Sequence, residues 1–250
     1  MITKIHKTFT ATVAAIFLSS VSMAAVAPIT AATFSGSVAG TVTDPVSFTS
    51  ITVGGQVYSN LEYGTASYTG TLTNQYYYTA GEDPGTNLAA LSNNILTDGI
   101  LNIPRYLSVN FGRAITSEDL IFVTELASNG AGETLALGLI DSSNERISGT
   151  AVLFGDVGAG GPGDLFTMNV LRSSGDNDIN GVGVQGSGMF LSDFGSPGST
   201  VPYGIYFSNS SENELDPSVV GLATIPEPSS IALVLVFAGV FVIRARRRRC

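Results

Sequence analysis

Short runs of alternating apolar and polar residues, separated by turns, most constrain the fold of this chain. Leu107 to Phe111 alternates as a half-buried strand does, and the apolar runs at 119–126 and 133–140 resemble deeply buried strands. Gly, Asn, Asp and Ser separate such runs, and Gly54-Gly55 has the form of a two-residue hairpin turn. The pattern predicts an all-β fold, a β-sandwich or jelly roll, over residues 33–224.

The remaining body shows weaker versions of the same signal. We expect further strands at 46–53, 66–73, 147–154 and 165–171, and a short helix within 87–96, where apolar residues recur at helical spacing. Tyr76-Tyr77-Tyr78 has two interpretations, an aromatic platform for a sugar or a plain strand. The strand is preferred because tyrosine is common in strands without any ligand.

The composition of the body excludes several kinds of chemistry. The only histidine of the chain is His6 and the only cysteine is Cys250, so residues 33–224 contain neither, and the chain has no tryptophan. Disulfides, zinc sites built on Cys or His, and Ser-His-Asp or Cys-His nucleophiles are therefore excluded from the body. Four arginines against nineteen acidic residues give the body a net charge of −15. Nucleic acid and anionic membrane surfaces are excluded as partners, because nothing neutralises their phosphates.

The N-terminal segment reads as a secretory signal peptide, assigned here to residues 1–32. Lys4 and Lys7 form a basic start, and Phe9 to Val21 is an apolar stretch too short to span a membrane comfortably. Small residues follow, and cleavage is expected after Ala24 or Ala32, with Ala32 preferred. Cleavage after Ala27 is disfavoured because Pro28 would follow the cut.

The C-terminal segment, residues 225–250, has three parts in a fixed order. Pro226-Glu227-Pro228 forms a stiff, extended turn, and the serines that follow can cap a helix over the apolar residues 231–243. Such a helix spans about 20 Å against about 30 Å of hydrocarbon, which is short for a permanent anchor. An ordinary single-pass anchor remains the alternative. A cytoplasmic stop-transfer cluster then follows, made of Arg244, Arg246, Arg247, Arg248 and Arg249.

In order and spacing, this segment resembles the PEP-CTERM sorting signal, which an exosortase in the bacterial inner membrane recognises. Cys250 departs from the pattern, because such tails more often finish on basic residues. Two stretches of the body, 111–125 and 191–221, are similar to recurrent modules of PEP-CTERM surface proteins. The resemblance implies export by signal peptidase, a transient stay in the inner membrane, and exosortase processing near Pro226-Glu227-Pro228. It also implies a final place at the cell surface or in the extracellular matrix, with exopolysaccharide as a partner in a biofilm. It transfers no active site.

One motif of the body has the spacing of a cation site. Asp176, Asp178 and Asn180 place oxygen side chains at alternate positions, and a glycine follows, as in the opening of a calcium loop. An EF-hand is excluded because the twelfth loop position is Ser187 rather than Glu. The same residues favour a plain hairpin loop without metal, which is the preferred interpretation. Calcium is retained as the alternative, and no other cofactor is expected.

Paired carboxylates can catalyse glycoside hydrolysis, which needs two acids across a cleft. Asp119 and Glu125 would stand about 20 Å apart along one strand, too far to act together. The acids Glu212, Glu214 and Asp216 lie in a Ser- and Asn-rich stretch typical of a solvated surface. The sequence therefore predicts an exported, non-enzymatic matrix protein. The alternatives are a calcium-dependent, lectin-like glycan-binding module and a secreted hydrolase that uses carboxylates.

Overall fold

The structure is a computed structural model, and it describes most of the predicted body. The described residues are 26–39, 46–68, 76–78, 99–100, 107–127, 134–155, 164–172, 179–208 and 217–224. The signal-peptide residues up to 25, the predicted helix at 87–96 and the whole segment 225–250 lie outside these ranges. Within the described ranges, no helix is long and apolar enough to cross a membrane.

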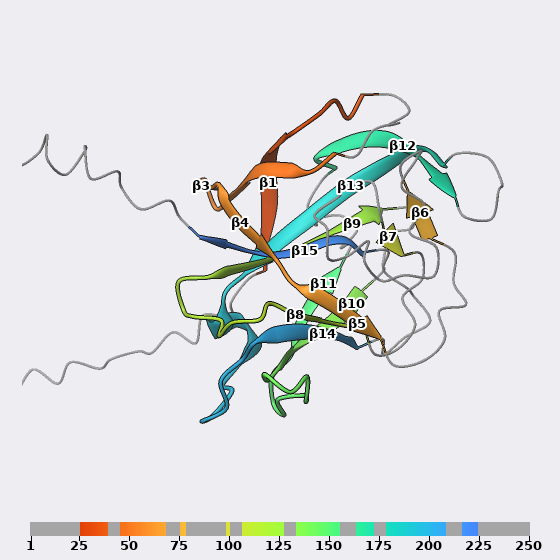
Figure 1. Cartoon of the computed structure of the whole chain (residues 1–250). Coiled ribbons are helices and arrows are strands. Elements are labelled where there is room, and N and C mark those ends of the chain that lie inside the picture. Colours follow the sequence, from red (N-terminus) through yellow and green to blue (C-terminus); the bar gives the residue numbers. More distant parts are fainter. Residues whose placement is uncertain are drawn as a thin grey trace, which may run out of the picture.

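Fifteen strands in these ranges form two antiparallel sheets (Figure 1). The ten-stranded sheet contains β1 (Ala27–Phe34), β2 (Phe48–Val53), β3 (Gln56–Tyr58), β4 (Asn60–Tyr63), β6 (Tyr76–Tyr78), β7 (Gly99–Ile100), β9 (Leu120–Ala127), β12 (Phe166–Arg172), β13 (Ile179–Met189) and β15 (Pro217–Thr224). The five-stranded sheet contains β5 (Thr65–Tyr68), β8 (Leu107–Asn110), β10 (Thr134–Ile140), β11 (Val152–Gly155) and β14 (Gly204–Ser208), in the order β11-β10-β14-β8-β5. One 3-10 turn, η2 (Leu191–Phe194), follows β13.

Strand β9 lies between two hydrophobic cores. Residues 120–124 of this strand are all buried, and their side chains alternate between the two faces of the strand. Ile121 and Val123 pack with the inner face of the five-stranded sheet in the first core. Leu120 and Phe122 pack with residues of β1, β2 and β3 in the second core. The five-stranded sheet thus covers one face of β9, and strands β1, β2 and β3 of the larger sheet cover the other. The two sheets form a nearly closed, barrel-like arrangement.

Strand β13 is the central strand of the larger sheet, and its glycine-rich sequence concealed it from the strand prediction. It pairs with β9 along one edge and with β12 and β1 along the other. A Cβ added at Gly186 would lie 2.6 Å from Ile29 Cδ1 and 2.9 Å from Thr124 Cγ2, and one at Gly188 would lie 2.9 Å from Leu120 Cδ1. Glycine is therefore required because neighbouring side chains pack directly on the backbone of β13.

The predicted all-β fold is confirmed, and most strand positions agree with the sequence. The hairpin turn at Gly54-Gly55 joins β2 to β3, with φ values of 57° and 79° that suit glycine. The predicted strand at 147–154 is wrong in its first half, since β11 begins only at Val152. The Thr150 hydroxyl donates to Ile147 O and accepts from Leu139 N–H, and these bonds fold the segment into a turn.

The expected boundary of the signal peptide falls inside a strand. Strand β1 begins at Ala27, five residues before the boundary at Ala32, and pairs with β2 and β13. Ile29 is only 2% exposed and belongs to the second core. The residues between Ala27 and Ala32 are therefore part of the folded body.

We expect Gly186→Val to destabilise the fold strongly, because the new side chain would have to displace Ile29 and Thr124. Overpacking of this kind costs about 1–3 kcal/mol. The measurement is the free energy of unfolding from urea denaturation. Gly36→Ala is the control, since its Cβ would meet only Val46 Cγ2 at 3.4 Å. Equal stability of the Gly186 variant and the parent would contradict the packing described for β13.

Candidate functional site

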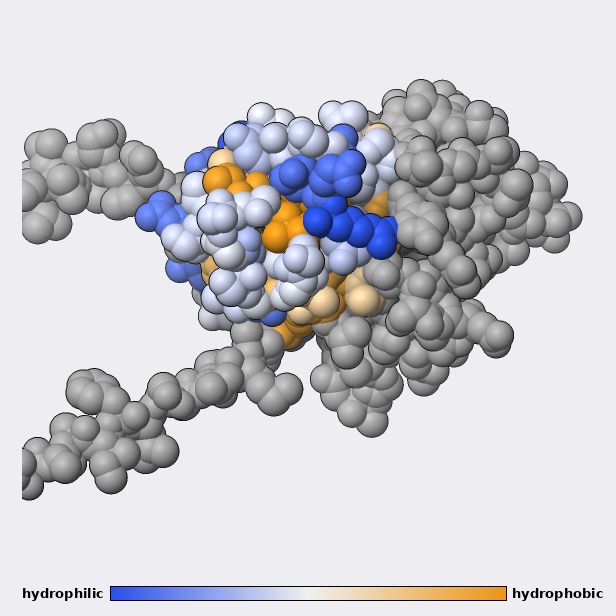
Figure 2. All heavy atoms as spheres, turned by 90° about the horizontal axis from the view of Figure 1, so that it is seen from below, coloured by the Kyte–Doolittle hydropathy of each residue, from blue (hydrophilic) through white to orange (hydrophobic). Residues whose placement is uncertain are grey.

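The outer face of the five-stranded sheet carries polar side chains over an apolar inner face. Leu107 and Val109 of β8 belong to the first core. Because side chains alternate along a strand, Ser108 and Asn110 face outward. On β14, Tyr206 faces outward between two core residues. Figure 2 views the molecule from the side on which β8 and β14 lie in Figure 1, and strongly hydrophilic residues gather there beside a small apolar area.

Strand register places four of the outward residues in one row. Ser67 of β5 lies opposite Ser108, Ser108 opposite Tyr206, and Tyr206 opposite Gly138 of β10. The Ser67 and Ser108 hydroxyls form a hydrogen bond of 2.9 Å. A Cβ at Gly138 would collide with the Tyr206 ring, so the ring lies flat against the backbone of β10. Small residues around one tyrosine leave this part of the face hollow.

The turn after β10 forms one wall of the hollow. The carboxylate of Asp141 accepts hydrogen bonds from the backbone N–H groups of Ser143 and Glu145 at 2.8 and 3.0 Å, which fixes the turn. The guanidinium of Arg146 lies over the Tyr206 ring, 4.6 Å from its centroid, in a cation–π contact. The ring is thus held between Arg146 and the sheet.

Two open hollows share Asn144, the residue at the tip of this turn. Asn144 has a φ of 64°, and its Oδ1 accepts a 2.8 Å hydrogen bond from Asn110 Nδ2. The larger hollow, about 460 Å³, lies over Ser108, Arg146 and Tyr206, and the smaller, about 300 Å³, lies over Ser67 and Asn110. Among the described residues, these hollows combine depth with exposed polar groups, and we regard them as the candidate site.

Tyr63 lines the smaller hollow and has an unused hydrogen-bonding group. Its hydroxyl is buried and has no hydrogen-bond partner among the residues that the structure describes. Burial raises the pKa of Tyr63 well above its ordinary value of 10.0, so the hydroxyl stays protonated and can donate. The Tyr63 ring packs against Phe122 in the second core, with 6.1 Å between ring centroids, so this hydroxyl is closed to solvent.

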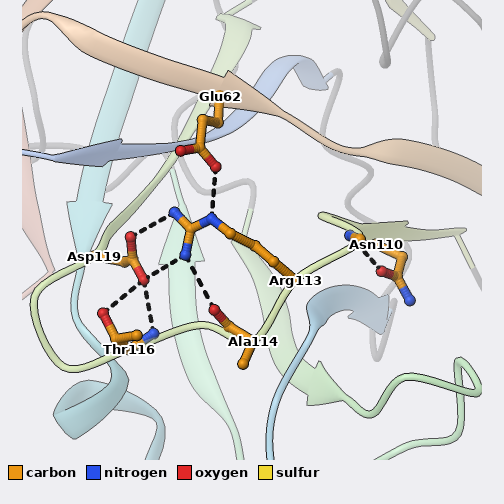
Figure 3. A network of polar contacts seen from close by, with 7 residues as sticks. Glu62, Asn110, Arg113, Ala114, Thr116 and Asp119 are labelled. Carbon is orange, nitrogen blue, oxygen red and sulfur yellow. Dashed lines mark hydrogen bonds and ion pairs between the residues drawn. The ribbon is translucent and has the colours of Figure 1, made fainter.

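A network around Arg113 secures the loop between β8 and β9 beside the smaller hollow (Figure 3). The guanidinium donates two hydrogen bonds to the Asp119 carboxylate, at 2.7 and 2.9 Å, and one to Glu62 Oε2 of β4 at 2.6 Å. Thr116 donates to Asp119 Oδ2 through both its N–H and its hydroxyl. The loop is thereby fixed to the larger sheet at β4 and at the start of β9.

The electrostatics of this network favour the ionised form of Asp119. Burial alone would raise the pKa of Asp119 by penalising its charge, but the hydrogen bonds from Arg113 and Thr116 outweigh burial and hold that pKa below its ordinary value of 3.8. The hydrogen bonds to Asp119 and Glu62 in turn raise the pKa of Arg113. A carboxylate held in this way is a structural anion and a poor general acid.

The sequence-predicted site residues fall mostly outside the described ranges. Asp176 and Asp178 lie outside them, and Asn180 is described only as the second residue of β13. The sorting motif at 226–228 and the arginines from Arg244 to Arg249 also lie outside. Within the described ranges, no group of three or more His, Cys, Asp and Glu residues is placed to hold a metal ion.

Sequence reasoning missed the hollows because their residues are distant in the chain. Ser67, Asn110, Asn144 and Tyr206 come from four separate segments, and only cross-strand register brings them together. One signal was available: Ser108 and Asn110 occupy the polar positions of an alternating strand. Comparison with models of protein families and with curated proteins finds no match for this sequence.

We expect Arg113→Met to cost about 3–5 kcal/mol of unfolding free energy, because it leaves the buried Asp119 carboxylate without its cation. Glu62→Gln is the control and should cost less than about 1 kcal/mol, since that ion pair is exposed. Urea denaturation at neutral pH measures both. Similar losses of unfolding free energy in the two variants would contradict the claim that Arg113 stabilises the fold mainly by pairing with the buried Asp119.

The stability that Asp119 contributes should depend on pH. A carboxyl with a lower pKa in the folded than in the unfolded chain stabilises the fold above its unfolded pKa, and this contribution is lost as the pH falls through the folded pKa. Asp119→Asn should therefore be less stable than the parent at pH 7, with the difference narrowing below about pH 3.8. A difference that stays constant from pH 7 to pH 2.5 in urea titrations would refute this assignment.

Proposed function

We propose that this chain is an exported bacterial surface protein of the PEP-CTERM type, sorted and processed by an exosortase and associated with exopolysaccharide in a biofilm matrix. The observation that carries the proposal is the segment 225–250, in which the Pro-Glu-Pro turn, the apolar stretch and the arginines follow one another in order. Signal peptidase and exosortase act on the chain during export. The finer fold in this proposal is a β-sandwich or jelly-roll ectodomain, which two sheets packed on a shared core support.

The positions of the first and last strands suit a chain held at both ends by one membrane. Ala27, Gly188, Phe122 and Gly221 form a single row across β1, β13, β9 and β15. Strands β1 and β15 run in opposite directions, so the chain enters and leaves the sheet at the same end. The separation is three strand spacings, about 14 Å. An N-terminal signal segment and a C-terminal apolar segment can then lie in the same bilayer without distorting the body.

The body supports a role without catalysis. Its sequence has no histidine or cysteine to act as base or nucleophile, and the buried Asp119 is engaged by Arg113. The net charge of −15 keeps the body away from anionic surfaces. Before processing, the short apolar segment 231–243 holds the protein at the inner membrane, and after it the body resides at the cell surface or in the matrix.

Processing at the C-terminal segment is the direct test. In cells that contain an exosortase, mass spectrometry of the mature protein should find a C-terminus close to Pro226-Glu227-Pro228. Replacing these three residues with alanine should block processing and leave the end Arg249-Cys250 intact. The control Pro197→Ala, in the body, should be processed like the wild type and lose that end. A wild-type protein that keeps Arg249-Cys250 would overturn the proposal and leave a simple anchored protein.

We further expect signal peptidase to cut after Ala24 rather than after Ala32. Cleavage after Ala32 would remove most of β1, including the buried Ile29, and would expose the edges of β2 and β13. N-terminal sequencing of the mature protein should therefore read Ala25-Val26-Ala27. Ala24→Leu should block this cut, and Ala32→Leu should leave it unchanged. A mature chain that starts at Thr33 would contradict the place of β1 in the fold.

A further inference from the structure

We infer that the two hollows on the outer face of the five-stranded sheet bind a neutral polysaccharide chain, without calcium. The inference rests on the proposed function for the presence of polysaccharide around the protein. It goes beyond that function by naming the surface and the class of glycan. It also differs from the calcium-dependent alternative, because the residues involved are far in sequence from Asp176 and Asp178.

The first argument is the kind of groups that line the hollows. Sugar rings present many hydroxyls that both donate and accept hydrogen bonds, and they are bound by amides, hydroxyls and charged groups placed on a rigid frame. Ser108 and Tyr206 supply hydroxyls, Asn144 supplies an amide, and Glu145 and Arg146 supply an acceptor and a donor set. Strands and a hydrogen-bonded turn hold all of these groups.

The second argument is the shape of the site. Asn144 lines both hollows, and it accepts a hydrogen bond from Asn110, which lines the smaller one. Together the hollows extend from the turn after β10 to the edge strand β5, across β14 and β8. Both are open to solvent, so a polymer can cross the sheet and leave at either end. An enclosed pocket would instead suit a free sugar or another small molecule.

The third argument is charge. Glu145 and Arg146 stand side by side in the larger hollow, so the local charge is near zero. The rest of the body is strongly acidic, and its net charge of −15 repels anionic polymers over distances of about a Debye length. A neutral chain meets no such repulsion. Its binding should therefore depend only weakly on salt.

The test is affinity electrophoresis of the full chain, purified in a non-ionic detergent, through gels that contain one polysaccharide each. The neutral probes are dextran, galactomannan and a mixed-linkage β-glucan, and alginate is the acidic probe. We expect at least one neutral polymer to retard the protein, with no change on adding a chelator or 0.3 M salt. Retardation by alginate alone, or by none of the four, would overturn the inference.

Matched variants test whether binding occurs at the hollows. Ser67→Trp fills the smaller hollow from an exposed position of an edge strand and should weaken retardation about tenfold. Thr49→Trp is the control: it is also an exposed strand hydroxyl with a hydroxyl partner, Thr33, but it lies on β2 of the other sheet. Arg146→Gln changes an exposed residue and should weaken binding several-fold. It tests the site independently in case Ser67→Trp does not fold. Wild-type retardation in both Ser67→Trp and Arg146→Gln would refute the site.

Failure of this inference is distinguishable from failure of the proposed function. The C-terminus of the protein, read by mass spectrometry in the producing cells, reports on sorting alone. A processed chain that no polysaccharide retards would reject the glycan site and leave the sorting proposal standing. An unprocessed chain that a neutral polysaccharide retards, with or without a chelator, would reject the sorting proposal and leave the glycan site standing.

Discussion

The close approach of side chains to the backbone of β13 is the constraint on which the rest of the structure depends. Ile29, Leu120 and Thr124 occupy the space that side chains at Gly186 and Gly188 would need. This contact brings β1 and β9 against one central strand, and β9 in turn carries both hydrophobic cores. Without it, the larger sheet could not bend around β9 and cover its second face.

The sequence predicted the parts of the fold that depend on local pattern. Strand β9 was recognisable because its apolar run is continuous, and the β2–β3 hairpin because Gly54-Gly55 favours one kind of turn. Strand β13 escaped prediction because glycine has low strand propensity, and only the neighbouring strands explain its presence. The candidate site escaped for a related reason, since register between distant strands has no local signature. The polar alternation of β8 indicated that Ser108 and Asn110 face outward, but it did not indicate which residues of other strands lie beside them.

The Arg113 network and the hollows are physically connected. Asn110, Phe111 and Gly112 line the smaller hollow, and Arg113 follows them directly in the chain. Its bonds to Asp119 and Glu62 hold the loop against the larger sheet, while Ile115 N–H donates to Pro202 O beside β14. A few charged hydrogen bonds thus stabilise the wall of a surface that itself carries little net charge.

The arrangement of β15 also determines how the body responds to force. This strand ends at Thr224 and is bonded along both edges, to β4 on one side and to β9 on the other. A pull on Thr224 along the strand axis loads the hydrogen bonds of both ladders together, in shear, instead of opening them one after another. A chain held through this end would therefore resist extension with many bonds at once, and the strain would pass through β9 into both cores.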